Sequence, residues 1–417
     1  MPTRDFDLVL LGATGFTGGL VAGYLAQQRR PMKWALVGRN RDKLEAVARD
    51  VVARNSSIAS AGGAGAAQHG NVPVIVADAL DPAAMAEVAH RTRVVCTTAG
   101  PYATCGAEVV AACAAAGTHY CDLTGEVGFM RRMIDEHHQR ARQTGARIVH
   151  ACGFDSIPSD LGTWAAQQEF ARRFGHPAQH VTALFGETSG AISGGTAASA
   201  LEMARAAGED RELRRMLANP YALDPDPHAD RPPAPDVRTI SWNAELKMFT
   251  VPFVMAETNT RVVRRAHALA NFPWGNDFVY TEVMSAPGNA LGLARAVATT
   301  GVLAGLAFAL KRPALRDQLA KRVPKPGEGP DEKTRARGHW KARIVAAKGA
   351  EQLVYIAADP AGDPGYGSTM KMLGEAAMCL AFDDLKSAGG VTTPSVAMGG
   401  ALLERLRAAG LQFHPAD

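Results

Sequence analysis

A glycine-rich segment near the start of the chain constrains the possible fold most strongly. Gly12, Gly15 and Gly18 follow the apolar run Leu8–Leu11 and open an amphipathic stretch. Glycine here allows a tight turn, a close approach of a pyrophosphate group and close packing of helix on strand, so the segment predicts a dinucleotide-binding unit. We expect the phosphates at the N-terminus of the helix, where backbone N–H groups are free. The residues expected to form this loop are Gly12, Ala13, Thr14, Gly15, Phe16, Thr17 and Gly18.

The N-terminal region repeats this strand-then-helix alternation. Apolar runs of strand length alternate with amphipathic runs, which predicts an α/β fold with a doubly wound parallel sheet, a Rossmann domain. The expected strands are residues 8–11, 34–37, 74–77, 94–97, 119–122 and 147–151. The expected helices begin near Phe16, Arg41, Pro82, Ala107 and Glu126. Residues 54–71, rich in Gly, Ala and Ser, are expected to form a flexible surface insertion.

The pattern changes after residue 152, and a chain of 417 residues is long for one domain. Strand-like runs and a proline-rich loop at 219–236 predict a mixed α+β second domain. The expected strands there are 180–187, 238–243, 278–285, 339–347 and 352–358, and the tail is expected to be helical at 368–385 and 400–409. We predict an NADP-binding Rossmann domain at 1–165, a mixed α+β substrate or dimerisation domain at 166–364, and a C-terminal helical segment at 365–417 that packs back on the Rossmann domain.

Composition excludes several other classes of protein. The net charge of +4 gives no reason to expect nucleic-acid binding. The six cysteines form no CxxC pair and have no zinc-type spacing with histidine, so we expect buried free thiols and no metal site. Free thiols suit a reducing compartment, and the first residues lack a charged-then-apolar leader, so we expect a cytoplasmic protein.

The end of the second expected strand indicates the cofactor. NAD enzymes usually carry an acidic residue there, whereas this chain has Arg39 followed by Asn40. A guanidinium group suits the 2′-phosphate of NADP(H), and the alternative is a solvated arginine that opens the next helix. Asp78, after the third strand, is expected at the adenine edge. The residues expected beside the nicotinamide are Thr98, Ala99, Gly100 and Pro101.

Several motifs resemble those of the saccharopine dehydrogenase-like oxidoreductase family, including its branch of mycobacterial trans-acting enoyl reductases of cell-wall lipid synthesis. The motifs are residues 12–18, 99–102, 120–126, 153–162, 193–196, 365–366 and 389–394. The resemblance implies a Rossmann domain plus a mixed-sheet domain, and it does not imply saccharopine as the substrate. Cys105 departs from the pattern, because the family commonly has an aromatic residue in that loop.

Three residues after the expected strands are candidates for catalysis. Tyr102 is a candidate hydrogen-bond donor to a substrate carbonyl, and the alternative is a packing tyrosine. Glu126 and Asp155 lie at the carboxyl edge of the sheet, where such folds bind ligands. The alternative to a catalytic role is that Glu126 complements the dipole of the helix it precedes, and that Asp155 caps a helix. His150 is expected to be a core residue. The sequence shows no Ser-His-Asp arrangement, so a hydrolase is not expected.

These observations leave three hypotheses for the function. The first is an NADPH-dependent reductase of an acyl-type substrate, such as an enoyl thioester held by a carrier protein or coenzyme A. The second is an amino-acid imine oxidoreductase of saccharopine dehydrogenase type, in which Arg261, Arg264 and Arg265 bind carboxylates. The third is a non-catalytic NADP-binding module associated with a membrane.

Residues 290–310 form an apolar stretch that is followed by a basic one at 311–343. Three interpretations are open for the apolar stretch. The first is a helix buried in the second domain or in a homodimer interface. The second is a wall or lid for an apolar substrate chain. The third is a peripheral contact with the inner face of the plasma membrane through residues 290–343.

Overall fold

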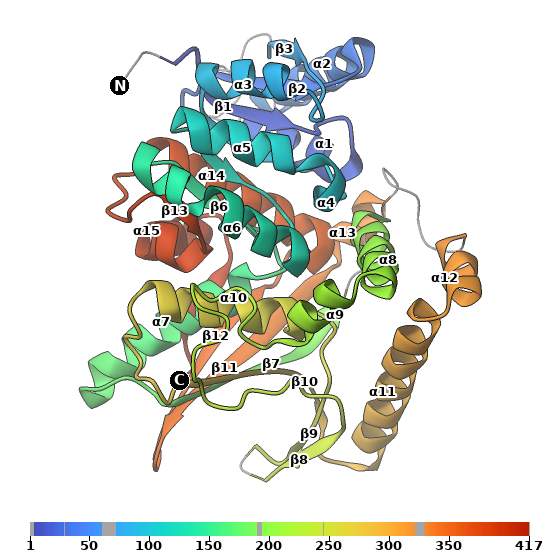
Figure 1. The fold of residues 1–417 in the computed structure, drawn as a ribbon, viewed down its shortest axis with the longest axis vertical. Helices are drawn as coiled ribbons and strands as arrows, with labels where there is room; N and C mark the ends of the chain where they lie inside the picture. Colours follow the sequence, from blue (N-terminus) through green and yellow to red (C-terminus); the bar gives the residue numbers. More distant parts are fainter. Residues whose placement is uncertain are drawn as a thin grey trace.

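Two seven-stranded sheets organise the part of the chain described by the computed structural model, residues 4–28, 30–60, 72–189, 194–244, 246–321, 329 and 331–416. The Rossmann sheet lies at one end of the molecule and the mixed sheet at the other (Figure 1). The predicted fold class, a Rossmann domain plus a mixed second domain, is confirmed.

The first sheet is entirely parallel and has the order β13-β6-β5-β4-β1-β2-β3. Its strands are β1 (Phe6–Leu11), β2 (Trp34–Gly38), β3 (Val74–Val76), β4 (Thr92–Thr97), β5 (His119–Cys121), β6 (Arg147–Val149) and β13 (Gly390–Thr392). The six predicted strands are present. The seventh, β13, comes from the C-terminal region and is too short to show a periodic pattern in the sequence.

Helices cover both faces of this sheet, because successive side chains of a buried parallel strand point to opposite faces. In β1, Leu8 and Leu10 join one hydrophobic core, and Val9 and Leu11 join another. The helices are α1 (Phe16–Ala26), α2 (Arg41–Ser60), α3 (Pro82–Arg91), α4 (Tyr102–Cys105), α5 (Ala107–Ala116), α6 (Val127–Thr144) and α7 (Ile157–Phe174). The predicted insertion at 54–71 is helical up to Ser60, and residues 61–71 lie outside the described part of the chain.

The second sheet is mixed, with the order β14-β12-β11-β7-β10-β9-β8. Its strands are β7 (His180–Ser189), β8 (Ser241–Asn243), β9 (Met248–Val251), β10 (Val279–Pro287), β11 (His339–Lys348), β12 (Glu351–Asp359) and β14 (Gln412–Pro415). Only the β7–β10 pair is parallel among the strand pairs of this sheet. The accompanying helices are α8 (Gly194–Glu209), α9 (Arg211–Ala218), α10 (Ala256–Leu269), α11 (Ala290–Leu310), α12 (Pro313–Ala320) and α13 (Glu332–Ala336).

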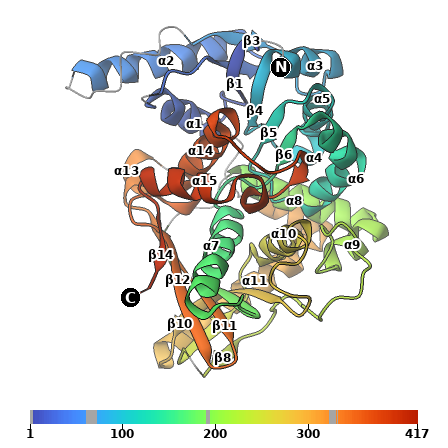
Figure 2. The same ribbon diagram turned by 90° about the vertical axis from the view of Figure 1, so that its left-hand side faces the viewer.

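The C-terminal region connects the two halves. A π-helical turn (Pro364–Ser368) leads into α14 (Thr369–Phe382), which packs on α1, β4 and β5, and α15 (Pro394–Ala408) packs on α7. In Figure 2 both helices lie between the two sheets. The region is more than a helical segment, since β13 extends the Rossmann sheet and β14 extends the mixed sheet.

A buried carboxylate fixes this connection. Asp160 in α7 accepts hydrogen bonds from the backbone N–H of Ser395 at 2.7 Å and from its hydroxyl at 2.6 Å. These bonds satisfy donors in the first turn of α15, which carries no side-chain cap of its own. The 153–162 and 389–394 regions noted in the sequence are thereby held together.

Helix α11 corrects one of the expectations. Only 6% of its most apolar window is buried, so the interpretation of α11 as a helix buried in the second domain is wrong. The helix stands along the side of the second domain in Figure 1. It is the one helix of the described chain that is long and apolar enough to cross a membrane by length and composition.

Candidate functional site

The glycine loop follows β1 directly and turns into α1. Gly12 has a φ of +90°, and a Cβ atom there would lie 2.8 Å from the backbone nitrogen of Ala99. A Cβ atom on Gly18 would lie 2.2 Å from the carbonyl oxygen of Gly12. Both positions therefore require glycine for the loop to close against the strand that ends at Thr97.

Gly15 differs, because a Cβ atom there would meet only the carbonyl oxygen of Gly12, at 3.4 Å. It is exposed, it is the N-cap residue of α1, and no side chain caps this helix end. Its own N–H donates to the carbonyl of Gly12 at 3.0 Å, which shapes the turn. The next N–H groups of α1 start a helix with no acidic side chain in its first turn. This arrangement fits a bound pyrophosphate.

The second half of the chain also reaches this loop. The ring of Phe16 packs edge-on against Tyr366 of the π-helical turn, with ring centroids 4.8 Å apart. The guanidinium group of Arg335, on α13, lies over the ring of Phe16 itself, 5.4 Å from the ring centroid. These neighbours could not be predicted from local patterns, because they are more than 300 residues away from the loop.

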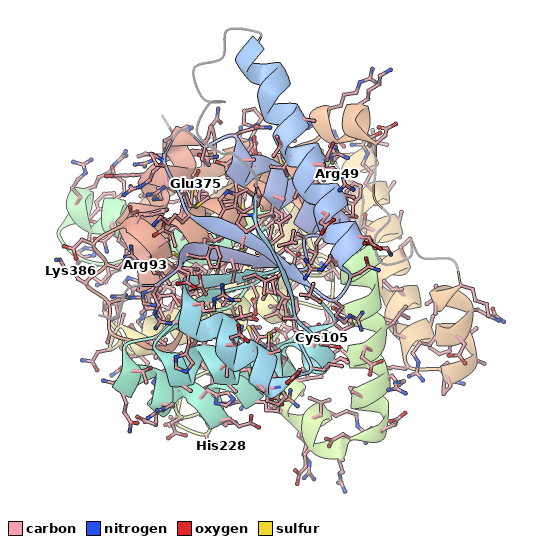
Figure 3. All side chains as sticks on the ribbon, turned by 90° about the horizontal axis from the view of Figure 1, so that it is seen from above. Arg49, Arg93, Cys105, His228, Glu375 and Lys386 are labelled. Carbon is pink, nitrogen blue, oxygen red and sulfur yellow. The ribbon has the colours of Figure 1, made fainter. Side chains whose placement is uncertain are left out.

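The residues expected at the adenosine end lie at the ends of β2 and β3. Arg39 and Asn40 are exposed, and Asn40 accepts the N–H of Lys43 at 2.9 Å as it opens α2. Asp78 accepts the N–H of Leu80 at 3.0 Å in the turn after β3. Burial raises the pKa of the Cys105 thiol, with Arg39 and Asp78 acting on it in opposite directions. Cys105 (labelled in Figure 3) therefore lies within electrostatic reach of both.

The loop after β4 carries the residues expected beside the nicotinamide. Thr98 donates from its hydroxyl to the carbonyl of Gly12 at 3.2 Å, and Ala99 donates its N–H to the hydroxyl of Thr97 at 3.1 Å. Gly100 and Pro101 follow and lead into α4. The loop thus contacts the glycine turn directly.

Tyr102 and Glu126 support this loop. The buried Tyr102 hydroxyl donates to the carbonyl of Thr97 at 3.2 Å and accepts the N–H of Leu123 at 3.2 Å. Burial, with the nearby Asp122 carboxylate, holds the pKa of Tyr102 well above its usual value. In this structure the Tyr102 hydroxyl is occupied by these two backbone bonds, and its role as a donor to a substrate carbonyl stays a prediction.

The Glu126 carboxylate binds the start of α4 rather than its own helix. It accepts the backbone N–H groups of Tyr102 at 3.0 Å and Ala103 at 2.7 Å. The hydroxyl of Ser199 in α8 donates to it as well, at 2.7 Å. Through these contacts Glu126 holds the loop after β4 in place, and its candidate role in catalysis stays a prediction.

Asp122 and His150 form a buried pair at the same edge of the sheet. The Asp122 carboxylate accepts the Tyr120 hydroxyl at 2.8 Å and contacts Nδ1 of His150 at 2.7 Å. It also accepts the N–H groups of Thr124 and Ala151, which tie the loops after β5 and β6 to each other. His150 is a core residue, as expected, and it lines a cavity of about 10 Å³, roughly the size of one water molecule; its buried Nε2 has no hydrogen-bond partner among the described residues.

Asp155 remains the strongest candidate for acid chemistry. In the described part of the chain, no side chain donates a hydrogen bond to its carboxylate or forms an ion pair with it. Burial, reinforced by the charge of Asp122, raises the pKa of Asp155 to about 6. Its carboxylate lies beside Gly125, where Met255 and Thr258 of the second domain also approach. Asp155 therefore lies where the loops after β5 and β6 meet the start of α10.

Neither Asp155 nor Ser156 caps α7 with its side chain, so the alternative interpretation of these residues as helix caps is not supported. Ser156 is the N-cap residue of α7, but its hydroxyl donates to the side-chain oxygen of Asn259 at 2.9 Å. Asn259 in turn donates to the Glu282 carboxylate at 2.6 Å, and burial raises the pKa of Glu282 to about 7. The loop that carries Asp155 is thus anchored to the second domain.

The three arginines that the imine hypothesis needs are buried in structural contacts. Arg261 pairs with Asp236 and donates to the carbonyl of Leu217. Arg264 donates to the carbonyls of Pro220 and Tyr280. Arg265 donates to those of Leu223 and Val391. They hold the proline-rich loop against α10, so they are not available to bind a substrate carboxylate.

The parallel sheet, the glycine turn beside its switch point and the cationic end of β2 define a dinucleotide-binding oxidoreductase domain. The family model described as the saccharopine dehydrogenase NADP binding domain matches residues 8–149, so the cofactor is NADP(H). The chain is 40% identical to a trans-acting enoyl reductase of Mycobacterium ulcerans and 39% identical to one of Mycobacterium leprae, in both cases over 98% of this chain and 97% of the relative.

The protein belongs to this trans-acting enoyl reductase branch of the saccharopine dehydrogenase-like oxidoreductases. A solved structure of saccharopine dehydrogenase (L-Glu forming) from Saccharomyces cerevisiae has the same fold, with a TM-score of 0.51 and 12% identity over 98% of this chain and 99% of that one. The family resemblance drawn from the motifs is therefore confirmed, and the chain is an NADP-dependent oxidoreductase.

Proposed function

We propose that this oxidoreductase reduces the activated double bond of an enoyl thioester, held by coenzyme A or by an acyl carrier protein. The names of the relatives at about 40% identity support this substrate class. Reduction of such a bond needs a hydride at the β-carbon and a proton at the α-carbon. Bound NADPH supplies the hydride.

The proposal depends mainly on the raised pKa of Asp155 and on its position at the edge of the sheet. Its carboxyl group has a pKa of about 6, raised chiefly by burial, so about a tenth of the molecules keep this proton at pH 7, far more than an ordinary aspartate would. It is bound to no other side chain of the described residues and follows the strand next to β5, at the sheet edge where such folds bind ligands. In the proposal, the Asp155 carboxyl gives its proton to the α-carbon as the double bond accepts the hydride.

The burial of Arg261, Arg264 and Arg265 speaks against the amino-acid imine alternative. An amino-acid substrate presents carboxylates, and these need cations free to pair with them. The three guanidinium groups already bind backbone carbonyls and Asp236. An uncharged acyl chain requires no such partners.

The test measures NADPH oxidation by the full-length protein with short and long enoyl-coenzyme A esters, and with a keto acid plus an amine. We expect turnover with the enoyl esters only, and a fall of at least a hundredfold in kcat for Asp155→Asn with unchanged NADPH affinity. Asp224→Asn is the matched control, because burial also raises the pKa of Asp224 to about 6, in the proline-rich loop. Turnover of the keto acid and amine, or no turnover at all, would overturn the proposal.

A further inference from the structure

Helix α11 exposes an apolar surface that no other part of the described chain covers. Its most apolar window has a mean hydropathy of 1.7, and 6% of it is buried. Val297 is 55% exposed, Val302 is 71% exposed and Phe308 is 55% exposed. Helices of globular proteins normally bury such side chains, and a contiguous exposed apolar patch marks an interaction surface.

The exposed side chains lie on opposite sides of the helix. Leu293 and Val302 are nine residues apart, which is about half a turn around an α-helix at roughly 100° per residue. Both are exposed, by 42% and 71%. One partner helix packs against a single face, whereas a fluid apolar medium surrounds both.

Both ends of α11 are fixed to the second domain. At its start, which the Asn289 side chain caps, Ala296 is buried against Val251 of β9 and Ala286 of β10. Its other end continues into α12, which packs on α8 (Figure 1). With both ends held on one side, the helix is suited to lie in a surface rather than to cross a bilayer.

Cations flank the apolar run. Residues 296–310 carry no charge, Arg295 precedes them, and Lys311 and Arg312 follow. The Arg312 guanidinium lies over the ring of Phe308, 4.9 Å from its centroid, so the apolar run ends in an aromatic–cation pair. Arg316 on α12 and Lys321 just after it add positive charge, and Asp317 is the sole acid between residues 290 and 321.

We propose that α11 and the start of α12 dock on an anionic lipid surface, such as a cytoplasmic leaflet presents. The apolar side chains enter the headgroup–acyl boundary, and Arg295, Lys311 and Arg312 meet the lipid phosphates. A second copy of the chain fits less well, because it brings the same excess of cations and one acid, and so offers no countercharge.

Vesicle co-sedimentation of the full-length protein tests this inference independently of the reductase activity. Vesicles of phosphatidylcholine alone are compared with vesicles that also contain phosphatidylglycerol, at low and high salt. We expect binding to the anionic vesicles only, and a loss of at least tenfold when salt is raised, because screening weakens the attraction. Binding to neither kind of vesicle, or equal binding to both, would overturn the proposal.

Variants then test whether the apolar side chains of α11, rather than any exposed apolar residue, are needed for vesicle binding. Val302→Glu with Phe308→Glu is expected to weaken anionic-vesicle binding at least tenfold, and circular dichroism is expected to be unchanged because both side chains are exposed. Leu80→Glu is the matched control, since Leu80 is 54% exposed on the Rossmann domain. A wild-type dimer in sedimentation velocity that the double variant dissociates would instead assign the surface to a second copy. Extraction of the protein only by detergent would contradict peripheral docking.

Discussion

The carboxylate of Glu126 accepts the backbone N–H of Tyr102 at 3.0 Å, and so joins the loops after β4 and β5. The same carboxylate takes the N–H of Ala103, which leaves the first turn of α4 satisfied. The loop of Thr98–Pro101, which faces the glycine turn, therefore depends on a residue more than twenty positions further along the chain.

We expect Glu126→Ala to weaken NADPH binding several-fold and to lower the thermal midpoint. Removing the carboxylate leaves two N–H groups without their acceptor, at a cost of about 1–3 kcal/mol. Glu126→Gln is the milder comparison, because its side-chain oxygen still accepts one of them. Fluorescence titration with NADPH and thermal unfolding measure both effects. A fall in kcat with unchanged NADPH affinity would show instead that Glu126 acts on the reaction.

The glycine loop offers a contrast between two substitutions. Gly15→Val adds a side chain on the open side of the loop, where the nearest atom to a Cβ is the Gly12 carbonyl oxygen at 3.4 Å. We expect this variant to fold normally and to lose NADPH affinity at least a hundredfold, since the side chain occupies the phosphate position.

Gly18→Ala is expected to affect stability more than NADPH affinity, the reverse of Gly15→Val. Its Cβ would lie 2.2 Å from a backbone oxygen, which cannot rotate away, so the variant is expected to lose stability first. Thermal unfolding without cofactor separates the two cases. Normal NADPH affinity in a folded Gly15→Val variant would show that the phosphates bind elsewhere.

Much of the Rossmann half was predictable because its signals are local. Alternating apolar runs identified β1 to β6, and glycine spacing identified the turn into α1. β13 was not predictable, because a three-residue strand has no period and pairs with β6 from more than 200 residues away. The loop residues expected at the cofactor do lie at the carboxyl edge of this sheet, although their individual contacts to NADP(H) stay predictions.

The parts of the site that escaped prediction depend on contacts between distant segments. Glu126 was expected to act at α6 or in catalysis, but its carboxylate meets α4 because two loops approach each other. The same reason conceals the contact of Arg335 with Phe16. The apolar composition of 290–310 was visible, but its exposure was not, since composition does not say what packs against a helix.

Cofactor preference gives the next prediction. Arg39 is exposed at the end of β2, in the position where an NAD enzyme usually carries an acid. We expect NADPH to bind at least tenfold more tightly than NADH, which corresponds to about 1.4 kcal/mol. Arg39→Ala should remove most of this difference while leaving NADH affinity nearly unchanged. Titration of both cofactors checks it, and equal wild-type affinities would contradict the role of Arg39.

The last prediction concerns the pH dependence that Asp155 imposes. Its pKa in the folded protein is about 6, above the usual 3.8, so the folded state binds this proton more tightly than the unfolded state does. The stabilising contribution of the proton is present at low pH and is lost as pH rises through about 6. Above that pH, the carboxylate is ionised in a largely desolvated position, with no ion-pair partner among the described side chains.

Asp155→Asn removes this dependence. We expect the variant to become more stable than the wild type by about 1–2 kcal/mol between pH 5 and pH 8, as measured by urea unfolding. The wild-type kcat for an enoyl thioester is expected to fall about tenfold per pH unit above the pKa, because the proton donor is lost. Asp224→Asn should show a similar gain in stability with an unchanged kcat profile, since burial raises its pKa to about 6 as well. A wild-type kcat that rises with pH would rule out Asp155 as the acid.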